Sequence, residues 1–161
     1  MRMLKMLMVV SFCAVTCGAN AQTAAGISDD DLRKYAITMD SVKVMQQTLT
    51  QIIAENVQKN TVMPVSRYNE LFKITDDQAK LQQANATPDE IAFLKEINEL
   101  RQYNIARINA AYQALAKEYV GLKAFNAIKK SLEADENLKK RYEGISQQVQ
   151  TSKPSPSTKG K

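Results

Sequence analysis

The chain of 161 residues contains no histidine and no tryptophan, and its two cysteines, Cys13 and Cys17, both lie near the N-terminus. Without histidine, the chain forms neither a Ser-His-Asp triad nor a Cys–His zinc site. The five glycines include no glycine-rich phosphate-binding loop. If the N-terminal segment is removed after export, the mature chain also lacks a thiol nucleophile and a disulfide.

The first 21 residues have the three parts of a secretory signal peptide. A basic start with Arg2 and Lys5 precedes an apolar stretch over residues 6–15, and an Ala-x-Ala site ends at Ala21. This order predicts export and cleavage after Ala21, which makes the mature protein periplasmic or extracellular. The apolar stretch is shorter than the roughly 20 residues of a membrane-spanning helix.

Two alternatives to cleavage after Ala21 follow from the same segment. An uncleaved N-terminal anchor is one. A lipoprotein is the other, because Cys13 and Cys17 lie nearby, but Phe12 and Thr16 precede them where a lipobox has a small residue. Cleavage after Ala21 is the interpretation that we favour.

The formal net charge of +5 comes from the two ends of the chain. Five of the 22 basic residues lie outside residues 22–150, and the remaining 17 match the 17 acidic residues in that range. Nucleic-acid-binding domains concentrate positive charge on their folded part, so a nucleic-acid partner is not expected. Residues 151–161 consist mostly of Ser, Pro, Lys and Gly, and we expect them to form a disordered tail.

The mature sequence is typical of an all-α protein, because Ala, Gln, Lys, Leu and Glu dominate and β-branched alternation is absent. We expect one domain over residues 22–150, an antiparallel helical bundle of two long helices plus shorter helices. The expected helices cover about residues 29–60, 66–84, 88–120 and 122–132, with a last segment from 135.

Local signals set the expected helix starts. Ser28 precedes three aspartates that suit the positive end of a helix dipole, and Ser66 is expected to cap the second helix. Thr87-Pro88-Asp89-Glu90 combines an N-cap, a proline at the first helical position and a capping-box glutamate. Gly121 is expected to end the second long helix.

Apolar residues at steps of three and four predict one buried face on each long helix. On the first helix they are Leu32, Tyr35, Ala36, Met39, Val42, Met45, Leu49, Ile52 and Ile53. On the second helix they are Ile91, Leu94, Ile97, Leu100, Ile105, Ile108, Tyr112, Leu115 and Tyr119.

The two halves of the mature chain resemble each other, which suggests repeats over residues 28–84 and 87–145. Each half has a capped long helix and then a short helix with an aromatic-Asn pair, Tyr68-Asn69 in one and Phe125-Asn126 in the other. Internal duplication is the interpretation that we favour, and chance similarity between helical sequences is the alternative.

The segment from Val120 to Ile128, followed by Asp135-Glu136-Asn137-Leu138, resembles the closing motif of domain-of-unknown-function family 4168. The opening pattern of that family, an acidic cap and then Leu-x-x-Tyr-Ala, is similar to residues 30–36. The resemblance implies an exported bacterial helical protein without an assigned activity, and it carries over no catalytic residue. The motif residues, which we interpret as structural, are Tyr68, Asn69, Gly121, Phe125, Asn126, Ile128, Asp135 and Leu138.

The aromatic-Asn pairs are the best candidate sites. Our interpretation is that Tyr68 and Phe125 are core residues and that Asn69 and Asn126 satisfy nearby backbone groups; a ligand cleft lined by the two asparagines is the alternative. Asp40-Ser41-Val42 also resembles a bacterial O-glycosylation acceptor.

Carboxylate clusters at 29–31, 76–77, 89–90 and 135–136 raise the alternatives of hydrolysis or calcium binding, but most lie at expected helix starts. No catalytic residue, cofactor site or metal site is therefore expected. The hypothesis that we favour is a non-enzymatic envelope protein that binds an unknown protein or surface. The alternative is a periplasmic holdase-type chaperone that uses Met39, Met45 and Met63.

Overall fold

The computed structural model describes residues 26–152, so the predicted signal peptide and residues 153–161 lie outside the described part. Within residues 26–152 the protein is all-α, without a strand, as the sequence predicts. No helix in this range is long and apolar enough to cross a membrane.

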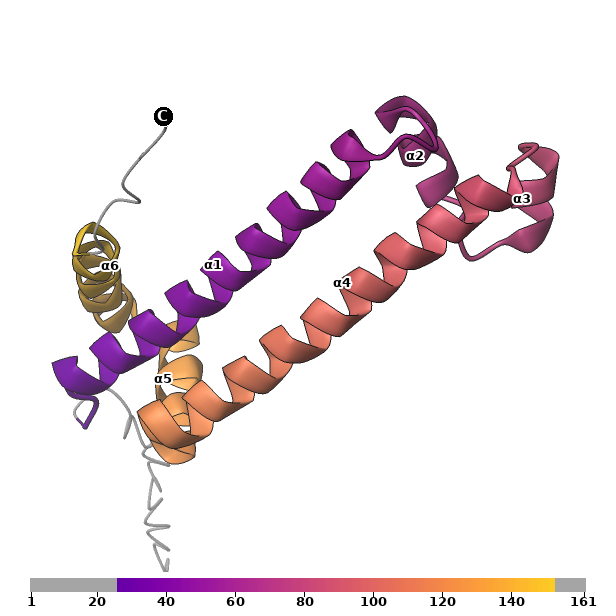
Figure 1. The fold of residues 1–161 in the computed structure, drawn as a ribbon. Helices are drawn as coiled ribbons and strands as arrows, with labels where there is room; N and C mark the ends of the chain where they lie inside the picture. The colour runs from indigo at the N-terminus through magenta and orange to yellow at the C-terminus, as the bar shows by residue number, and fades with distance from the viewer. Residues whose placement is uncertain (1–25, 153–161) are drawn as a thin grey trace, which may run out of the picture.

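Two long antiparallel helices form the frame of the molecule (Figure 1). Helix α1 covers Asp29–Lys59 and α4 covers Pro88–Ala114. The Ser28 side chain accepts a hydrogen bond from the Asp31 amide, and the predicted capping box between Thr87 and Glu90 is present. Both helix starts are therefore set by the local signals that the sequence shows.

Two short helices connect the long ones at one end of the hairpin. Helix α2 covers Val65–Phe72 and α3 covers Gln78–Gln83. The prediction that Ser66 caps α2 is wrong, because Pro64 takes that position and provides no side-chain cap. Asp77 accepts a hydrogen bond from the Lys80 amide and starts α3, so the expected single helix is divided in two.

At the other end the chain changes its helical period before it folds back. A π-helix, η1, covers Leu115–Gly121 and runs directly into α5, Leu122–Ala134. The second long helix is thus α-helical only to Ala114, not to residue 120 as predicted. Gly121 has φ of 88°, a left-handed conformation that glycine adopts without a Cβ penalty, and it marks the change of direction.

The last helix, α6, covers Glu136–Thr151 and packs along the first part of α1. The Asp135 carboxylate accepts hydrogen bonds from the amides of Asn137 and Leu138, as expected for an N-cap. An ion pair of 2.6 Å between Arg141 and Asp29 joins α6 to the start of α1. Helix α6 reaches Thr151, one residue into the segment that we expected to form the tail.

Most of the buried hydrophobic residues form two separate clusters, one at each end of the hairpin, and the buried Ile108 on α4 belongs to neither. The first cluster joins the start of α1 to η1, α5 and α6, and its buried members are Leu32, Tyr35, Ala36, Ala116, Val120, Phe125, Ile128, Leu138, Ile145 and Val149. The second cluster joins the end of α1 to α2, α3 and the start of α4, and its buried members are Val57, Met63, Tyr68, Leu71, Leu81, Phe93, Leu94 and Ile97.

The second cluster is closed by a polar network around Glu90. Arg67 Nε donates to Glu90 at 3.0 Å, and the same guanidinium donates to the Ala84 carbonyl at 2.8 Å. The Thr87 amide also donates to Glu90 at 2.9 Å. The hydrogen bond from Arg67 and those from Thr87 hold the pKa of Glu90 below its ordinary value of 4.5.

We expect Glu90→Gln to lower the free energy of unfolding at pH 7 by about 1–3 kcal/mol, because charge-assisted hydrogen bonds are lost. A lowered folded-state pKa means that ionised Glu90 contributes its full stabilisation above pH 4.5 and loses it as the pH falls through the folded-state pKa. Denaturant unfolding of both proteins at pH 7 and pH 3 measures this. A stability difference that stays constant between the two pH values would contradict the assignment.

Candidate functional site

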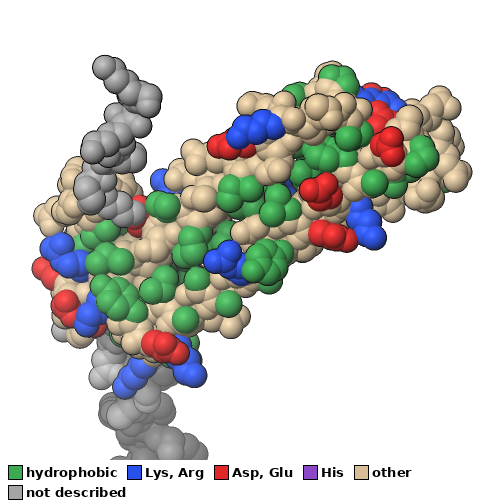
Figure 2. All heavy atoms as spheres, in the orientation of Figure 1, with side chains coloured by type: hydrophobic (Ala, Val, Ile, Leu, Met, Phe, Trp, Pro, Cys, Tyr) green, Lys and Arg blue, Asp and Glu red, His purple; other side chains and the backbone are tan. Residues whose placement is uncertain are grey.

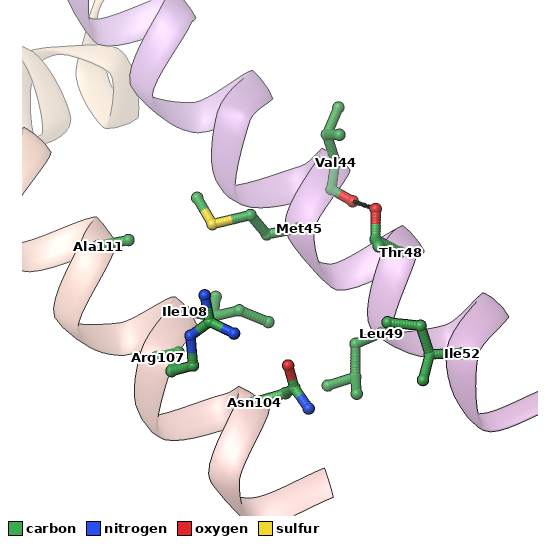
Figure 3. A pocket seen from close by; sticks show the side chains of 9 residues that line it. All are labelled: Val44, Met45, Thr48, Leu49, Ile52, Asn104, Arg107, Ile108 and Ala111. Atoms are coloured by element: carbon green, nitrogen blue, oxygen red, sulfur yellow. Dashed lines mark hydrogen bonds between the residues drawn. The ribbon is translucent and has the colours of Figure 1, made fainter. Parts of the chain in front are cut away.

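The candidate site is the middle of the α1–α4 hairpin, between the two clusters. Here the molecule is one layer of two helices, and an open groove of about 310 Å³ runs between them (Figure 3). Figure 2 shows hydrophobic side chains along the middle of this face. The groove is lined by Val44, Met45, Thr48, Leu49, Ile52, Asn104, Arg107, Ile108 and Ala111.

Several residues at this level are exposed although the sequence predicts a buried face. Ile52 is 37% exposed and Ile105 is 39% exposed, so the prediction that they belong to the core is wrong. Val44 and Tyr103 are exposed as well, at 43% and 64%. The physical reason is that α2, α3 and α5 lie at the ends of the hairpin and α6 packs along α1 only up to Gln46, so no further helix covers Ile52 or Ile105.

The polar side chains of the groove bond mainly within their own helices. Thr48 Oγ1 donates to the Val44 carbonyl at 2.9 Å, and Asn104 Nδ2 donates to the Leu100 carbonyl at 2.9 Å (Figure 3 shows the Thr48 bond). The guanidinium of Arg107 lies 5.7 Å from the centre of the Tyr103 ring, within the range of a cation–π interaction. The groove therefore presents apolar surface with one basic group at its edge, which suits a protein surface.

A second groove lies beside the same section of the hairpin. It shares Leu49 with the first and is otherwise lined by Thr50, Ile53, Arg101 and Ile105. At 100° per residue, Thr50 points about 200° away from Thr48 around α1, so this groove opens on the opposite side of the helix pair. The middle of the hairpin thus exposes apolar side chains on both of its faces.

The structure places the aromatic motif residues in different clusters. Phe125 is 4% exposed, and its ring centroid lies 4.9 Å from that of Tyr35 and 5.6 Å from that of Tyr112. Tyr68 is 5% exposed and stacks on Phe72 at 5.5 Å. Each aromatic residue lies on a short helix at one end of the hairpin, as a duplicated unit would place them; the duplication itself stays a prediction.

The asparagines of the two pairs do not fit the interpretation that we favoured. Asn69 and Asn126 are both exposed, so neither satisfies a buried backbone group. They also lie on opposite ends of the hairpin, on α2 and α5, and do not form a shared cleft. Asn126 lines an open groove of about 330 Å³ together with Lys117, Leu122 and other residues of α4, η1 and α5.

The remaining motif residues have structural positions. Ile128 and Leu138 are fully or almost fully buried in the first cluster, at 0% and 1% exposure. Gly121 joins η1 to α5, and Asp135 caps α6. The resemblance motif therefore coincides with the packing and capping of α5 and α6.

The acidic residues serve mainly as helix caps and ion-pair partners. Asp77 and Asp135 cap α3 and α6, and Glu90 belongs to the capping box of α4. Residues 26–152 contain no group of three or more His, Cys, Asp or Glu side chains that could hold a metal ion. Residues 139–141 of α6 are Lys, Lys and Arg; Lys139 pairs with Glu136 and Arg141 pairs with Asp29, so acidic side chains accompany these basic ones.

No family model, curated protein or solved structure matches this chain. The resemblance to family 4168 therefore stays a prediction that rests on the motif residues. The class that the structure itself defines is an all-α hairpin protein with terminal helical clusters.

Sequence reasoning missed the groove residues Val44, Thr48, Asn104 and Arg107. A signal for them was present, because Val44, Thr48 and Ile52 continue the four-residue step beside the predicted core face. Thr48 lies on the same side of α1 as the β-branched apolar residues Val44 and Ile52. The apolar side of α1 is therefore wider than the part that contact with one other helix covers.

Proposed function

We propose that this protein is an exported, non-enzymatic interaction module of the bacterial cell envelope, and that it binds protein through the groove face of the α1–α4 hairpin. The observation that carries the proposal is the exposed apolar middle section between two closed hydrophobic clusters. The signal-peptide pattern and the resemblance to family 4168 support export. The intact mass of the exported protein is expected to match that of a chain beginning at Gln22.

The groove face suits a protein partner more than a small molecule. It is open along the helix pair and is not enclosed, whereas small-molecule sites bury most of their ligand. Exposed aromatic and arginine side chains such as Tyr103 and Arg107 are typical of protein interfaces. A second helical surface would cover the apolar residues of both long helices at once.

Site-specific photo-crosslinking tests this function in cells. A photoreactive residue at Thr48, which lines the groove, is expected to give protein adducts in the envelope, and mass spectrometry identifies them. The matched control is Gln47, an exposed neighbour on α1 that does not line the groove. Adducts at Thr48 that are no more abundant than at Gln47 would contradict the proposal.

The alternative function, a holdase-type chaperone, is favoured by one observation. Met45 lines the groove, and methionine adapts to varied apolar shapes. Met63, however, is buried in the second cluster and provides no client surface. A holdase is expected to suppress aggregation of an unfolded client at stoichiometric amounts and to lose this activity on Met45→Glu; unchanged aggregation rates would exclude this alternative.

A further inference from the structure

The outward side of α1 carries a palindromic pattern of residues. Forward from Asp30, steps of four, three, four and three residues lead to Val44. Backward from Lys59, steps of the same sizes in the same order lead to Met45. Steps of three and four keep side chains on one side of a helix, and the two runs meet at the one-residue step from Val44 to Met45. At 100° per residue the ten positions still form a single stripe about 100° wide. The stripe has a centre between residues 44 and 45, in the part of α1 that lines the groove.

Charged residues occupy both ends of this stripe. Counted from each end toward the centre, the acid comes first at the N-terminal end (Asp30, then Lys34) and the base comes first at the C-terminal end (Lys59, then Glu55). Lys34 pairs with Asp30 at 2.7 Å near the start of α1, and Lys59 pairs with Glu55 at 3.0 Å near its end. The side chains of Asp30, Glu55 and Lys59 are more than 60% exposed, and Lys34 is 35% exposed. All four charges are thus available to a partner that lies along α1.

The stripe is complementary to itself when two copies are antiparallel. A two-fold axis at the centre places Asp30 opposite Lys59 of the second copy, and Lys34 opposite Glu55 of the second copy. A parallel arrangement in register would oppose like charges at all four positions. Antiparallel helices in contact along an apolar stripe with oppositely charged ends are a stable and self-limiting arrangement.

The residues in the middle of the stripe are apolar or weakly polar. In the antiparallel register they lie opposite residues of similar size in the second copy. Ile37 lies opposite Ile52, Ser41 opposite Thr48, and Val44 opposite Met45 of the second copy. Val44, Met45, Thr48 and Ile52 line the groove between α1 and α4 (Figure 3). The charged ends therefore align the copies, and the groove residues supply the buried contact.

Helix α4 and the π-helix η1 that follows it have a related pattern beside the same centre. Met45 lies across the groove from Ala111 and Ile108 (Figure 3). The exposed Tyr103 and Tyr119 lie eight residues to either side of Ala111. The same axis would bring Tyr103 of one copy to the level of Tyr119 of the other.

We propose that the occupant of the groove face is a second copy of this chain, bound antiparallel about a two-fold axis at residues 44 and 45 of α1. The two hairpins then form a four-helix arrangement in which every neighbouring helix pair is antiparallel. This inference rests on the proposed function, since it names the protein that the interaction surface binds. The contact is isologous, so the same residues serve both copies.

Charge reversal that keeps each intrahelical pair tests the register. One variant combines Asp30→Lys with Lys34→Glu, a second combines Glu55→Lys with Lys59→Glu, and a third carries all four substitutions. Net charge is the same in all of them. Each of the first two opposes like charges across the axis and is expected to raise the dimer Kd by about tenfold or more, while the third restores opposite charges and recovers the wild-type Kd.

Sedimentation velocity of the purified protein from about 1 to 100 µM measures these Kd values. A monomeric wild type throughout this range would overturn the inference, as would a dimer that neither paired reversal weakens, or one that the fourfold reversal fails to restore. Val44→Glu, at the axis, is expected to abolish the dimer, and Thr50→Glu, on the opposite side of α1, to leave it intact. Equal effects of these two substitutions would also overturn it.

The proposed function is judged separately from the dimer. Adducts at Thr48 that contain another envelope protein, together with a monomeric wild type, would leave the interaction module in place and remove the second copy as its occupant. A wild-type dimer with the reversal pattern described, and no enriched adduct at Thr48, would show that the chain self-associates without this face being used in the envelope.

Discussion

Phe125→Ala is expected to lower the free energy of unfolding by about 3–5 kcal/mol. Phe125 is 4% exposed and contacts the rings of Tyr35 and Tyr112, which belong to α1 and α4. Truncation removes the buried apolar area and leaves a cavity between three helices that only partly relaxes. The loss is a large share of the ~5–15 kcal/mol that stabilises a typical domain.

Denaturant unfolding followed by circular dichroism measures the effect, and the adjacent Asn126 provides the control. Because Asn126 is exposed, Asn126→Ala is expected to change stability by no more than about 0.5 kcal/mol. If Phe125→Ala unfolded like the wild type, the aromatic side chain would have to be exposed. The first cluster would then be incorrectly assigned.

Leu71→Ala is expected to lower stability by about 2–5 kcal/mol through the second cluster. Leu71 is 0% exposed and lies on α2, a helix of eight residues that depends on tertiary packing because so short a helix is unstable alone. Hydrogen exchange should show the largest loss of protection in α2, α3 and the start of α4, because the two clusters share no buried residue.

The control for this second prediction is Val65, which lies at the start of α2 and is 43% exposed. Val65→Ala is expected to have little effect on the amide protection of α2. Loss of protection that is equally large around Phe125 in the Leu71→Ala protein would contradict the division into two clusters. It would mean that the two ends of the hairpin unfold as one cooperative unit.

The helix starts were predictable from the sequence because capping is local. Ser28 and the Thr87–Glu90 capping box act over three residues, so no tertiary information is needed. Ser66 shows the limit of this reasoning: Pro64 lies two residues upstream with extended backbone angles and takes the N-cap position first. The π-helix after Ala114 was not predictable, because the spacing of Leu115 and Tyr119 also fits an α-helix.

The exposed middle of the hairpin was missed for a different reason. Hydrophobic periodicity identifies the apolar side of a helix, but it does not say whether another helix covers that side. Ile52 and Ile105 have the same spacing as Leu32 and Ile97, yet only the latter two lie where short helices pack. Which residues form the candidate site therefore depends on where the short helices end.

The central claim, that the groove face is covered by protein in the envelope, is tested most directly by hydroxyl-radical footprinting of two methionines. Met45 lines the groove, and Met63 is 5% exposed in the second cluster, so Met63 is an internal reference. In dilute purified protein, Met45 should be oxidised faster than Met63. In the intact envelope, Met45 should lose most of this difference while Met63 stays unchanged. A ratio of Met45 to Met63 oxidation that is the same in both settings would contradict the account.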